Sequence, residues 1–123
     1  MTSSRPYLIR ALYEWIVDNS LTPHLLVDIQ VEGVDAPVEF AENGKLVLNL
    51  SPRAVRGLSM GNDVVTFDAR FSGRSRRVSV PVPAVLAIYA RENGQGMLFS
   101  DRDDGGEPPE GGGGGKPRLR VVK

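Results

Sequence analysis

Apolar residues recur three or four positions apart between Ser4 and Asn19, a spacing that predicts an amphipathic helix. Ser4 is expected to cap this helix, and Pro6 falls in its first turn, where the missing N–H costs nothing. The helix should end before Pro23, because the residue that precedes a proline favours extended geometry. The stripe expected to face a core consists of Leu8, Leu12, Trp15 and Ile16.

Beyond Pro23 the apolar residues occupy every second position, which is typical of strands with one buried face. The Asn43-Gly44 pair favours a tight hairpin turn, since both residue types tolerate positive φ. Ser72-Gly73 is expected to make a second turn of this kind. The alternating stretches that these turns separate are 25–31, 46–50, 65–71 and 78–82.

Three other stretches of the first hundred residues are less regular. Residues 51–62 contain Pro52 and two glycines and are predicted to form a structured loop with room for one helical turn. Residues 84–90 are apolar throughout, a pattern that fits a helix or a strand. Residues 93–99 join a glycine-rich turn to apolar side chains and predict the last hairpin of a small barrel. The sequence therefore predicts a mostly β domain with an N-terminal α-helix.

The composition changes abruptly after this domain, which is predicted to span residues 1–99. Residues 100–115 contain five acidic residues, one arginine and a run of five glycines, so they are predicted to be a flexible, disordered linker. Residues 116–123, KPRLRVVK, return apolar side chains between basic ones. A short apolar motif on a glycine-rich tether is typical of a linear docking peptide, and a frayed chain end is the alternative interpretation.

Charge balance and cysteine count narrow the class of protein. The 123 residues include 15 Lys+Arg, 15 Asp+Glu and no Cys, which suits one modest domain. The lack of cysteine excludes disulfides and thiolate metal sites and fits a reducing compartment, so a cytoplasmic protein is expected. The N-terminus lacks an export pattern, and no apolar run approaches the roughly 20 residues that cross a membrane. A net charge of zero argues against nucleic-acid binding.

Few residues are suited to catalysis or metal binding. His24, the single histidine, precedes Asp28 by four positions, but a histidine beside a proline at the start of a strand is more often structural. The carboxylates lack the spacing of zinc or calcium ligands, so no metal, cofactor or enzymatic activity is expected. The glycine run before Lys116 is not a phosphate-binding loop, because Glu110 and Pro117 occupy the positions of its essential Gly and Ser/Thr.

Arginines gather around the second predicted hairpin and leave three interpretations open. Four guanidinium groups on one hairpin could bind phosphates or the acidic side chains of a peptide, or they could simply be solvated. An RNA-binding module is the alternative function that such a cluster supports. The cluster consists of Arg70, Arg74, Arg76 and Arg77.

Five segments carry a family resemblance: RPYLIRALYEWIVDNSLTPHLLVDI near the N-terminus, VLNLSPRAV at 47–55, NDVVTFDARFSG at 62–73, IYARENG at 88–94 and the closing LRVVK. With these segments in order, the chain resembles the stringent starvation protein B (SspB) family, adaptors that deliver tagged substrates to the bacterial ClpXP protease. The resemblance implies a helix packed on an Sm-like or SH3-like β-barrel and a homodimer formed through the helix. It also implies binding of the ssrA degradation tag of stalled translation products, in extended form.

The resemblance assigns residues to three surfaces: a tag groove, a homodimer interface and a docking peptide. Arg70 is expected to meet an acidic tag residue at the rim of the tag groove. The implied tag groove is lined from Leu48-Asn49, residues 51–55 and residues 67–71. The residues assigned to tag binding within it are Leu48, Asn49, Ser51, Ala54, Val55, Phe67, Ala69, Arg70 and Phe71. The implied homodimer interface consists of Tyr7, Leu8, Ala11, Glu14 and Trp15. The peptide implied to dock on the N-terminal domain of the ClpX unfoldase contains Pro117, Leu119, Arg120, Val121, Val122 and Lys123.

Overall fold

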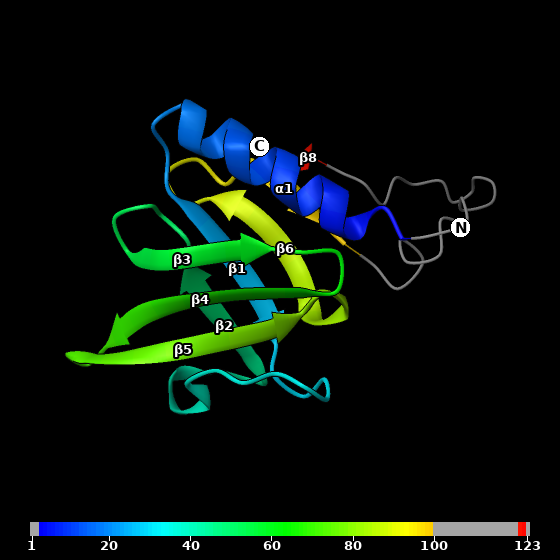
Figure 1. Cartoon of the computed structure of the whole chain (residues 1–123). Coiled ribbons are helices and arrows are strands. Elements are labelled where there is room, and N and C mark those ends of the chain that lie inside the picture. The colour runs from blue at the N-terminus through cyan, green and yellow to red at the C-terminus, as the bar shows by residue number, and fades with distance from the viewer. Residues whose placement is uncertain (1–2, 100–120, 123) are drawn as a thin grey trace.

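The strands of the chain form two antiparallel sheets, and the N-terminal helix packs against strands of both (Figure 1). A computed structural model describes residues 3–99 and a short strand at residues 121–122. The sheets have the strand orders β2-β1-β6-β7-β8 and β3-β4-β5. The elements are α1 (Arg5–Asp18), β1 (Pro23–Asp28), η1 (Val38–Phe40), β2 (Lys45–Asn49), β3 (Val55–Met60), β4 (Val64–Phe71), β5 (Arg74–Pro81), η2 (Val82–Ala84), β6 (Val85–Ala90), β7 (Gly96–Leu98) and β8 (Val121–Val122).

The prediction of a mostly β domain with an N-terminal helix is confirmed, but the sheets do not close into a barrel. The chain crosses from the five-stranded to the three-stranded sheet between β2 and β3. At the far edge of the three-stranded sheet, β5 meets only an isolated bridge between Asp35 and Ser79. A single bridge does not continue a ladder, so the two sheets remain separate layers. The predicted linker, residues 100–115, lies outside the described residues.

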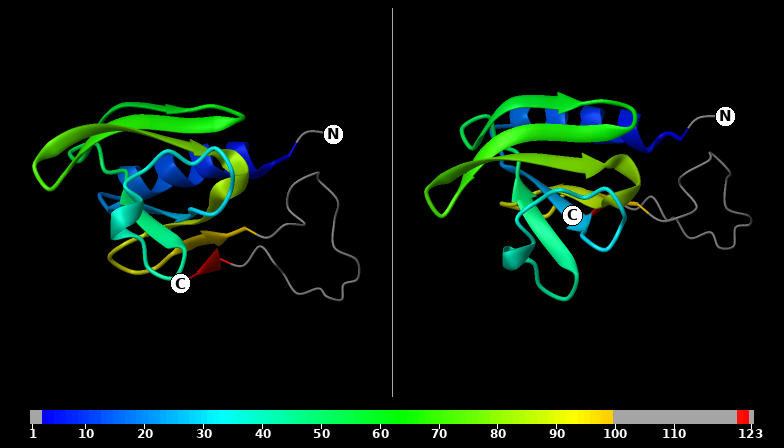
Figure 2. Two further views of the ribbon diagram at one scale, coloured as in Figure 1. Left: turned by 90° about the horizontal axis from the view of Figure 1, so that it is seen from below. Right: turned by 60° about the horizontal axis from the view of Figure 1, so that its bottom comes forward.

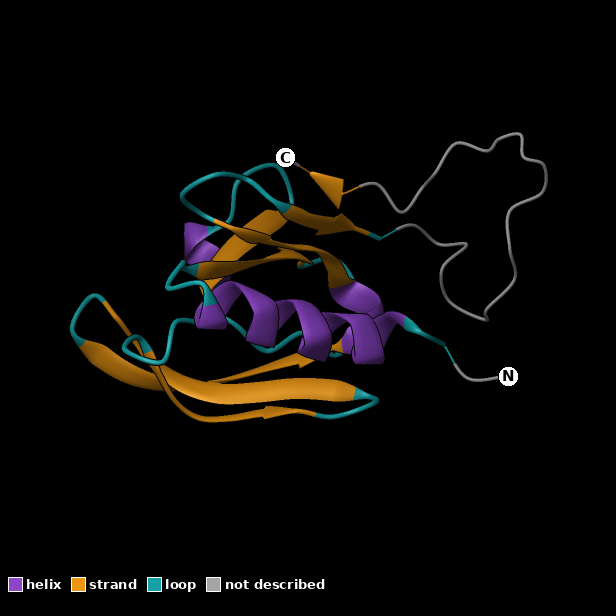
Figure 3. Cartoon of the chain, turned by 90° about the horizontal axis from the view of Figure 1, so that it is seen from above, coloured by secondary structure: helices purple, strands orange, loops and turns teal. Residues whose placement is uncertain are grey.

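The helix spans the predicted residues, but its buried face differs. Ser4 occupies the N-cap position, yet its side chain makes no capping hydrogen bond; its carbonyl accepts from the N–H groups of Tyr7 and Leu8. Ile9 and Ile16 are each 1% exposed, whereas Trp15 is 43% exposed. Leu8 and Leu12 are only partly buried. The sequence period left this open because the helix is apolar over more than one face. Figure 3 looks down on α1, with the three-stranded sheet on one side and the five-stranded sheet on the other.

Both predicted hairpin turns are confirmed. Asn43 and Gly44 have φ values of 56° and 78° and form the turn between Glu42 and Lys45, which pair as an isolated bridge at the start of β2. Ser72 and Gly73 have φ values of 54° and 82° and join β4 to β5. Two successive residues with positive φ give the backbone twist that matches the right-handed twist of the flanking strands. The register of the β4–β5 hairpin is therefore encoded locally. Residues 29–44 separate β1 from β2, so the Asn43-Gly44 turn does not set the register of that pair.

The prediction of a loop over residues 51–62 is wrong, because Val55–Met60 forms β3. The pairing register of β3 on β4 shifts between Arg56 and Ser59, and Gly57 has a φ of 65°. These features define a bulge, which interrupts the alternation of apolar residues that identifies a strand. The ambiguous stretch 84–90 is also resolved, since most of it forms β6.

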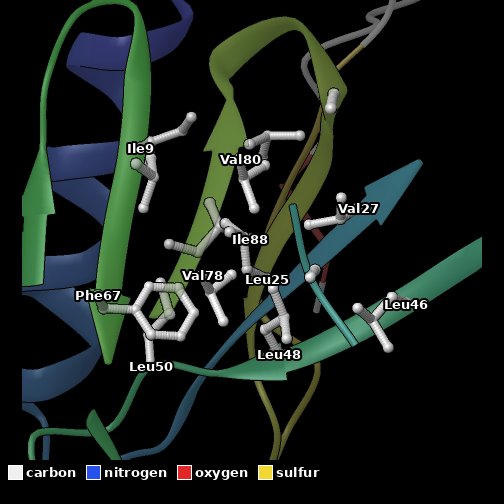
Figure 4. Close-up of a cluster of buried hydrophobic side chains, with 14 of the residues drawn as sticks. Ile9, Leu25, Val27, Leu46, Leu48, Leu50, Phe67, Val78, Val80 and Ile88 are labelled. Atoms are coloured by element: carbon white, nitrogen blue, oxygen red, sulfur yellow. The ribbon is translucent and has the colours of Figure 1, made fainter. Parts of the chain in front are cut away.

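Side chains from both sheets and the helix meet in one core (Figure 4). Phe67 of β4 is fully buried in the same core as Leu25 of β1 and Leu48 of β2, and its ring lies beside Leu50 in Figure 4. Burial of this apolar surface is the main stabilising contribution and fixes the position of β4 relative to β2. The labelled core residues are Ile9, Leu25, Val27, Leu46, Leu48, Leu50, Phe67, Val78, Val80 and Ile88.

Candidate functional site

An open groove of about 860 Å³ lies where β3 begins and β4 ends. Val55 pairs with Ala69 across these strands, so the turn that precedes β3 lies beside the end of β4. The small side chains of Ala54 and Ala69 are half-buried and leave space above the sheet. The groove is lined by Pro52, Arg53, Ala54, Val55, Arg56, Asp68, Ala69, Arg70 and Ser75.

Hydrogen bonds within the turn hold one wall of the groove. The Ser51 N–H donates to Asn49 Oδ1 over 2.8 Å, and the Arg53 N–H donates to Ser51 Oγ over 3.2 Å. The Ala54 N–H donates to the Ser51 carbonyl over 2.8 Å. Side chains that bond to nearby backbone groups stabilise turns of this kind. Asn49 and Ser51 therefore stabilise the turn that forms this wall, although neither residue lines the groove itself.

The groove carries an excess of positive charge. Arg53, Arg56 and Arg70 are all exposed along it. Its carboxylate, Asp68, accepts a hydrogen bond from Arg77 Nη1 over 3.1 Å, so its charge is already paired. Guanidinium groups bind carboxylates and phosphates through paired N–H donors. The groove is therefore suited to an anionic or acidic ligand in a partly extended form.

The residues implied as the tag groove fall into separate environments. Ala54, Val55, Ala69 and Arg70 line the groove together. Leu48 and Phe67 are 2% and 0% exposed and belong to the core, outside the groove lining. The Phe71 ring stacks on Phe40, with 6.1 Å between ring centroids, beyond the groove lining.

Two lining residues were missed by the sequence reasoning. Arg56 follows directly on VLNLSPRAV, and its charge beside a groove residue was a signal that could have identified it. Ser75 pairs with Arg70 across the β4–β5 hairpin. The predicted Ser72-Gly73 turn was a signal that could have placed Ser75, because a two-residue turn sets Arg70 opposite it. Cross-strand neighbours are the residues that pairing brings together, whatever their separation in sequence.

The arginine cluster of the β4–β5 hairpin is partly neutralised. Arg76 Nη2 lies 3.0 Å from Asp35 Oδ1 and also donates to the Ala36 carbonyl over 3.1 Å. Arg77 is paired with Asp68. Surface pairs of this kind contribute little stability, but they lower the charge available to a polyanion. Of the four arginines, Arg70 alone is among the residues that line the groove.

His24 lies in a structural setting. Its ring packs edge-on against Tyr89, with 5.7 Å between ring centroids. Partial burial and the neighbouring Arg91 lower the pKa of His24 below its ordinary value, while Glu92 opposes the shift. The Asp28 carboxylate accepts a hydrogen bond from the Gln30 N–H over 3.0 Å and stabilises the turn after β1.

Metal-binding and membrane-spanning features were searched for within residues 3–99 and 121–122. In this part of the chain, no three His, Asp or Glu residues gather closely enough to hold a metal ion. The helix that it contains is too short and too polar to cross a membrane.

The helix face implied as a dimer interface is accessible. Tyr7 and Trp15 are 51% and 43% exposed, and Ala11 and Glu14 are exposed between them. Residues seven and eight positions apart lie on one face of a helix, so these side chains share a surface. Leu8 borders this surface and is partly buried.

The implied docking peptide is only partly described. Val121 and Val122 form β8, which pairs antiparallel with β7. Pro117, Leu119, Arg120 and Lys123 lie outside the described residues.

The fold and the groove together define a class: a small two-sheet β domain with an N-terminal helix and a positively charged groove at the end of one sheet. Sequence comparison is more specific, since residues 3–123 match the family described as stringent starvation protein B. The chain belongs to this family, which confirms the resemblance seen in the sequence. It is 52% identical over 99 residues to the stringent starvation protein B homolog of Haemophilus influenzae; the match covers 80% of this chain and 66% of that relative's length.

Proposed function

We propose that this chain is a non-enzymatic cytoplasmic adaptor that binds ssrA-tagged proteins and delivers them to the ClpXP protease. The observation that supports this most directly is the groove, which brings together Ala54, Val55, Ala69 and Arg70. These residues were assigned to tag binding from the family resemblance alone. Unfolding and peptide hydrolysis belong to the protease, so the adaptor supplies binding surfaces and no catalytic group.

An extended peptide suits the shape and chemistry of this groove. Extended peptides are recognised through backbone hydrogen bonds and through pockets for alternate side chains. Ala54 and Ala69 provide room for a ligand side chain, while Arg53 and Arg70 provide charge at the rim. Rim charges steer association and confer salt dependence more than they set affinity.

The exposed face of α1 is proposed to form a homodimer with a second copy of the chain. Large exposed aromatic residues such as Tyr7 and Trp15 are enriched in protein interfaces. The Arg10 guanidinium lies 4.7 Å from the centroid of the Tyr7 ring and donates to the Met60 carbonyl over 3.0 Å. These contacts restrain the Tyr7 ring before association, which reduces the entropy lost on binding.

Residues 116–123 are proposed to dock on the N-terminal domain of ClpX, joined to the tag-binding domain by residues 100–115. A dimer would present two such peptides, so simultaneous docking on a multimeric unfoldase would strengthen each weak contact. The linker is short and glycine-rich compared with the longer acidic tails common in the family, which limits the span between the two docking peptides.

The first test is a fluorescence-anisotropy titration of a labelled ssrA-tag peptide. The full chain and a chain ending at Gly115 should bind with equal, saturable affinity, in the micromolar range or tighter. Ala69→Gln should weaken binding at least about tenfold by filling the groove. Thr66→Gln is the matched control, since Thr66 lies on the same strand, is equally half-buried and is absent from the groove lining.

Two outcomes would contradict this proposal. Thermal unfolding of each variant establishes that the fold is retained, and a folded Ala69→Gln protein that binds the tag normally places the binding site elsewhere. Absence of tag binding by the unmodified chain rejects the adaptor function altogether.

RNA binding is the second candidate, supported by the arginines of the β4–β5 hairpin. An RNA-binding protein should lose affinity steeply as salt rises, on a log-log scale, and should not bind the tag peptide. The pairing of Arg76 with Asp35 and of Arg77 with Asp68 favours the adaptor over this alternative. A titration with single-stranded RNA at two salt concentrations distinguishes the two.

A further inference from the structure

Strand β7 pairs with two strands, and one of them, β8, comes from a distant part of the sequence. On one side β7 pairs with β6, with Met97 opposite Ile88. On its other side it pairs antiparallel with β8, with Gly96 opposite Val122 and Met97 opposite Val121. Figure 2 shows β8 in red beside the orange β7, at the edge of the five-stranded sheet.

The backbone groups that face β8 are identified by the bonds that β7 makes to β6. The Gln95 carbonyl accepts from the Ala90 N–H over 2.8 Å, and the Phe99 N–H donates to the Leu86 carbonyl over 2.9 Å. Backbone groups of successive residues in an antiparallel strand face opposite sides. The N–H and C=O of Gly96 and Leu98 therefore face away from β6, towards β8.

We propose that this outer edge of β7 is a docking site for the chain's own C-terminal segment. The segment that includes Val121 and Val122 is then held on its own domain, through backbone pairing, when no partner is bound. The functional consequence of this docking rests on the proposed function, because residues 116–123 are also the segment proposed to dock on ClpX. A peptide added to a sheet edge is bound mainly through its main chain.

The covalent connection makes such a short pairing effective. A two-residue strand binds weakly by itself, but a linker of the length of residues 100–120 places it at an effective concentration on the order of millimolar. The self-docked state then competes with the partner. A segment that is held for roughly nine-tenths of the time binds its partner with an apparent affinity about tenfold weaker than the free peptide.

Amide hydrogen exchange tests the docking without any partner. In the full chain, the Gly96 amide should exchange slowly; in a chain ending at Gly115 it should exchange faster, while the amides of β1 and β6 keep their protection. Equal exchange of Gly96 in the two chains overturns the proposal. Protection that increases with protein concentration also overturns it, because the strand would then come from a second copy.

Leu98→Pro provides a variant that keeps the C-terminal segment intact. This substitution removes the N–H of Leu98, the next one after Gly96 that faces away from β6. Leu98 is 47% exposed, and proline is tolerated at sheet edges. The control is Val47→Pro on β2, the opposite edge strand, where the side chain is 46% exposed. Only Leu98→Pro should speed the exchange of Gly96; an equal effect of both variants indicates general loosening and contradicts the proposal.

The consequence for the partner is measured with the isolated N-terminal domain of ClpX. Leu98→Pro should bind it more tightly than the unmodified chain does, approaching a synthetic peptide of residues 116–123, and Val47→Pro should not. Equal affinities of the unmodified chain and Leu98→Pro contradict the proposed competition. If the synthetic peptide does not bind at all, the proposed ClpX docking fails, while the exchange experiment still decides whether β7 holds the segment.

Discussion

Arg5 is the buried charge of the described core, and its replacement should destabilise the domain strongly. The side chain is 2% exposed. Its Nη1 donates to the carbonyls of Pro83 and Val85, over 3.2 and 2.9 Å, and its guanidinium carbon lies 5.3 Å from the centroid of the Phe99 ring. These contacts join the start of α1 to the start of β6, nearly the whole domain apart in sequence.

The magnitude follows from what Arg5→Met removes. Hydrogen bonds from a charged donor contribute about 1.5–3 kcal/mol each, and a partly buried cation–π contact about 1 kcal/mol. Methionine keeps the packing of the aliphatic stem, so the loss should be about 4 kcal/mol after allowing for non-additivity. That is a large fraction of the roughly 5–15 kcal/mol that stabilises a domain of this size.

Urea denaturation followed by tryptophan fluorescence measures this loss. With an unfolding slope of about 1.5 kcal/mol per M, the midpoint should fall by roughly 2–3 M. Arg10→Met on the same helix is the matched control. Arg10 donates to one carbonyl, lies over the Tyr7 ring and is only half-buried, so about 1–2 kcal/mol is expected. Equal effects of the two substitutions would refute the reasoning and show that the cost of burying the Arg5 charge cancels its contacts.

Three further predictions concern the surface and the sheet. Thr22 donates to the Glu92 carboxylate through its N–H and its hydroxyl, over 2.8 and 2.6 Å, and these bonds hold the pKa of Glu92 at about 2. The contribution of Glu92 to stability is therefore present above its ordinary pKa and is lost as pH falls through about 2. In an NMR titration of Thr22→Val, the pKa of Glu92 should rise toward 4.5. Gly96→Ala should cost about 3 kcal/mol in urea denaturation, because its Cβ would lie 2.5 Å from Tyr89 Cα. Trp15→Glu should shift sedimentation equilibrium towards monomer, and an unchanged mass would exclude this face as the dimer interface.

Local signals in the sequence were sufficient for the helix and for the two hairpins. Asn43-Gly44 and Ser72-Gly73 adopt the positive φ values that their residue types favour. β3 was missed because its bulge at Gly57 breaks the alternating pattern. The buried face of the helix was predicted incorrectly, because contacts with strands far along the chain determine that Ile9 is buried. The spacing of apolar residues within the helix does not show which face those strands cover.

The groove was predictable only in part, for a similar reason. Ala54, Val55, Ala69 and Arg70 came from the family resemblance, and the structure brings them together. The same resemblance included Leu48 and Phe67, which alternate with surface residues but face the core. Separating lining residues from supporting residues requires knowing which face of each strand is buried. Arg56 required, in addition, the pairing register of β3 on β4, which shifts at the bulge, whereas Ser75 follows from the Ser72-Gly73 turn.

The contacts of α1 also determine the order in which this protein can complete its fold during synthesis. The helix leaves the ribosome first, but the strand that it contacts most, β6, is made near the end of the domain. At a synthesis rate of about 5–20 residues per second, the apolar face with Ile9 and Ile16 waits roughly 4–16 s for its partner. During that interval Arg5 lacks its acceptors at Pro83 and Val85. The nascent helix is thus a candidate client for chaperones that protect exposed apolar segments until the last strands arrive.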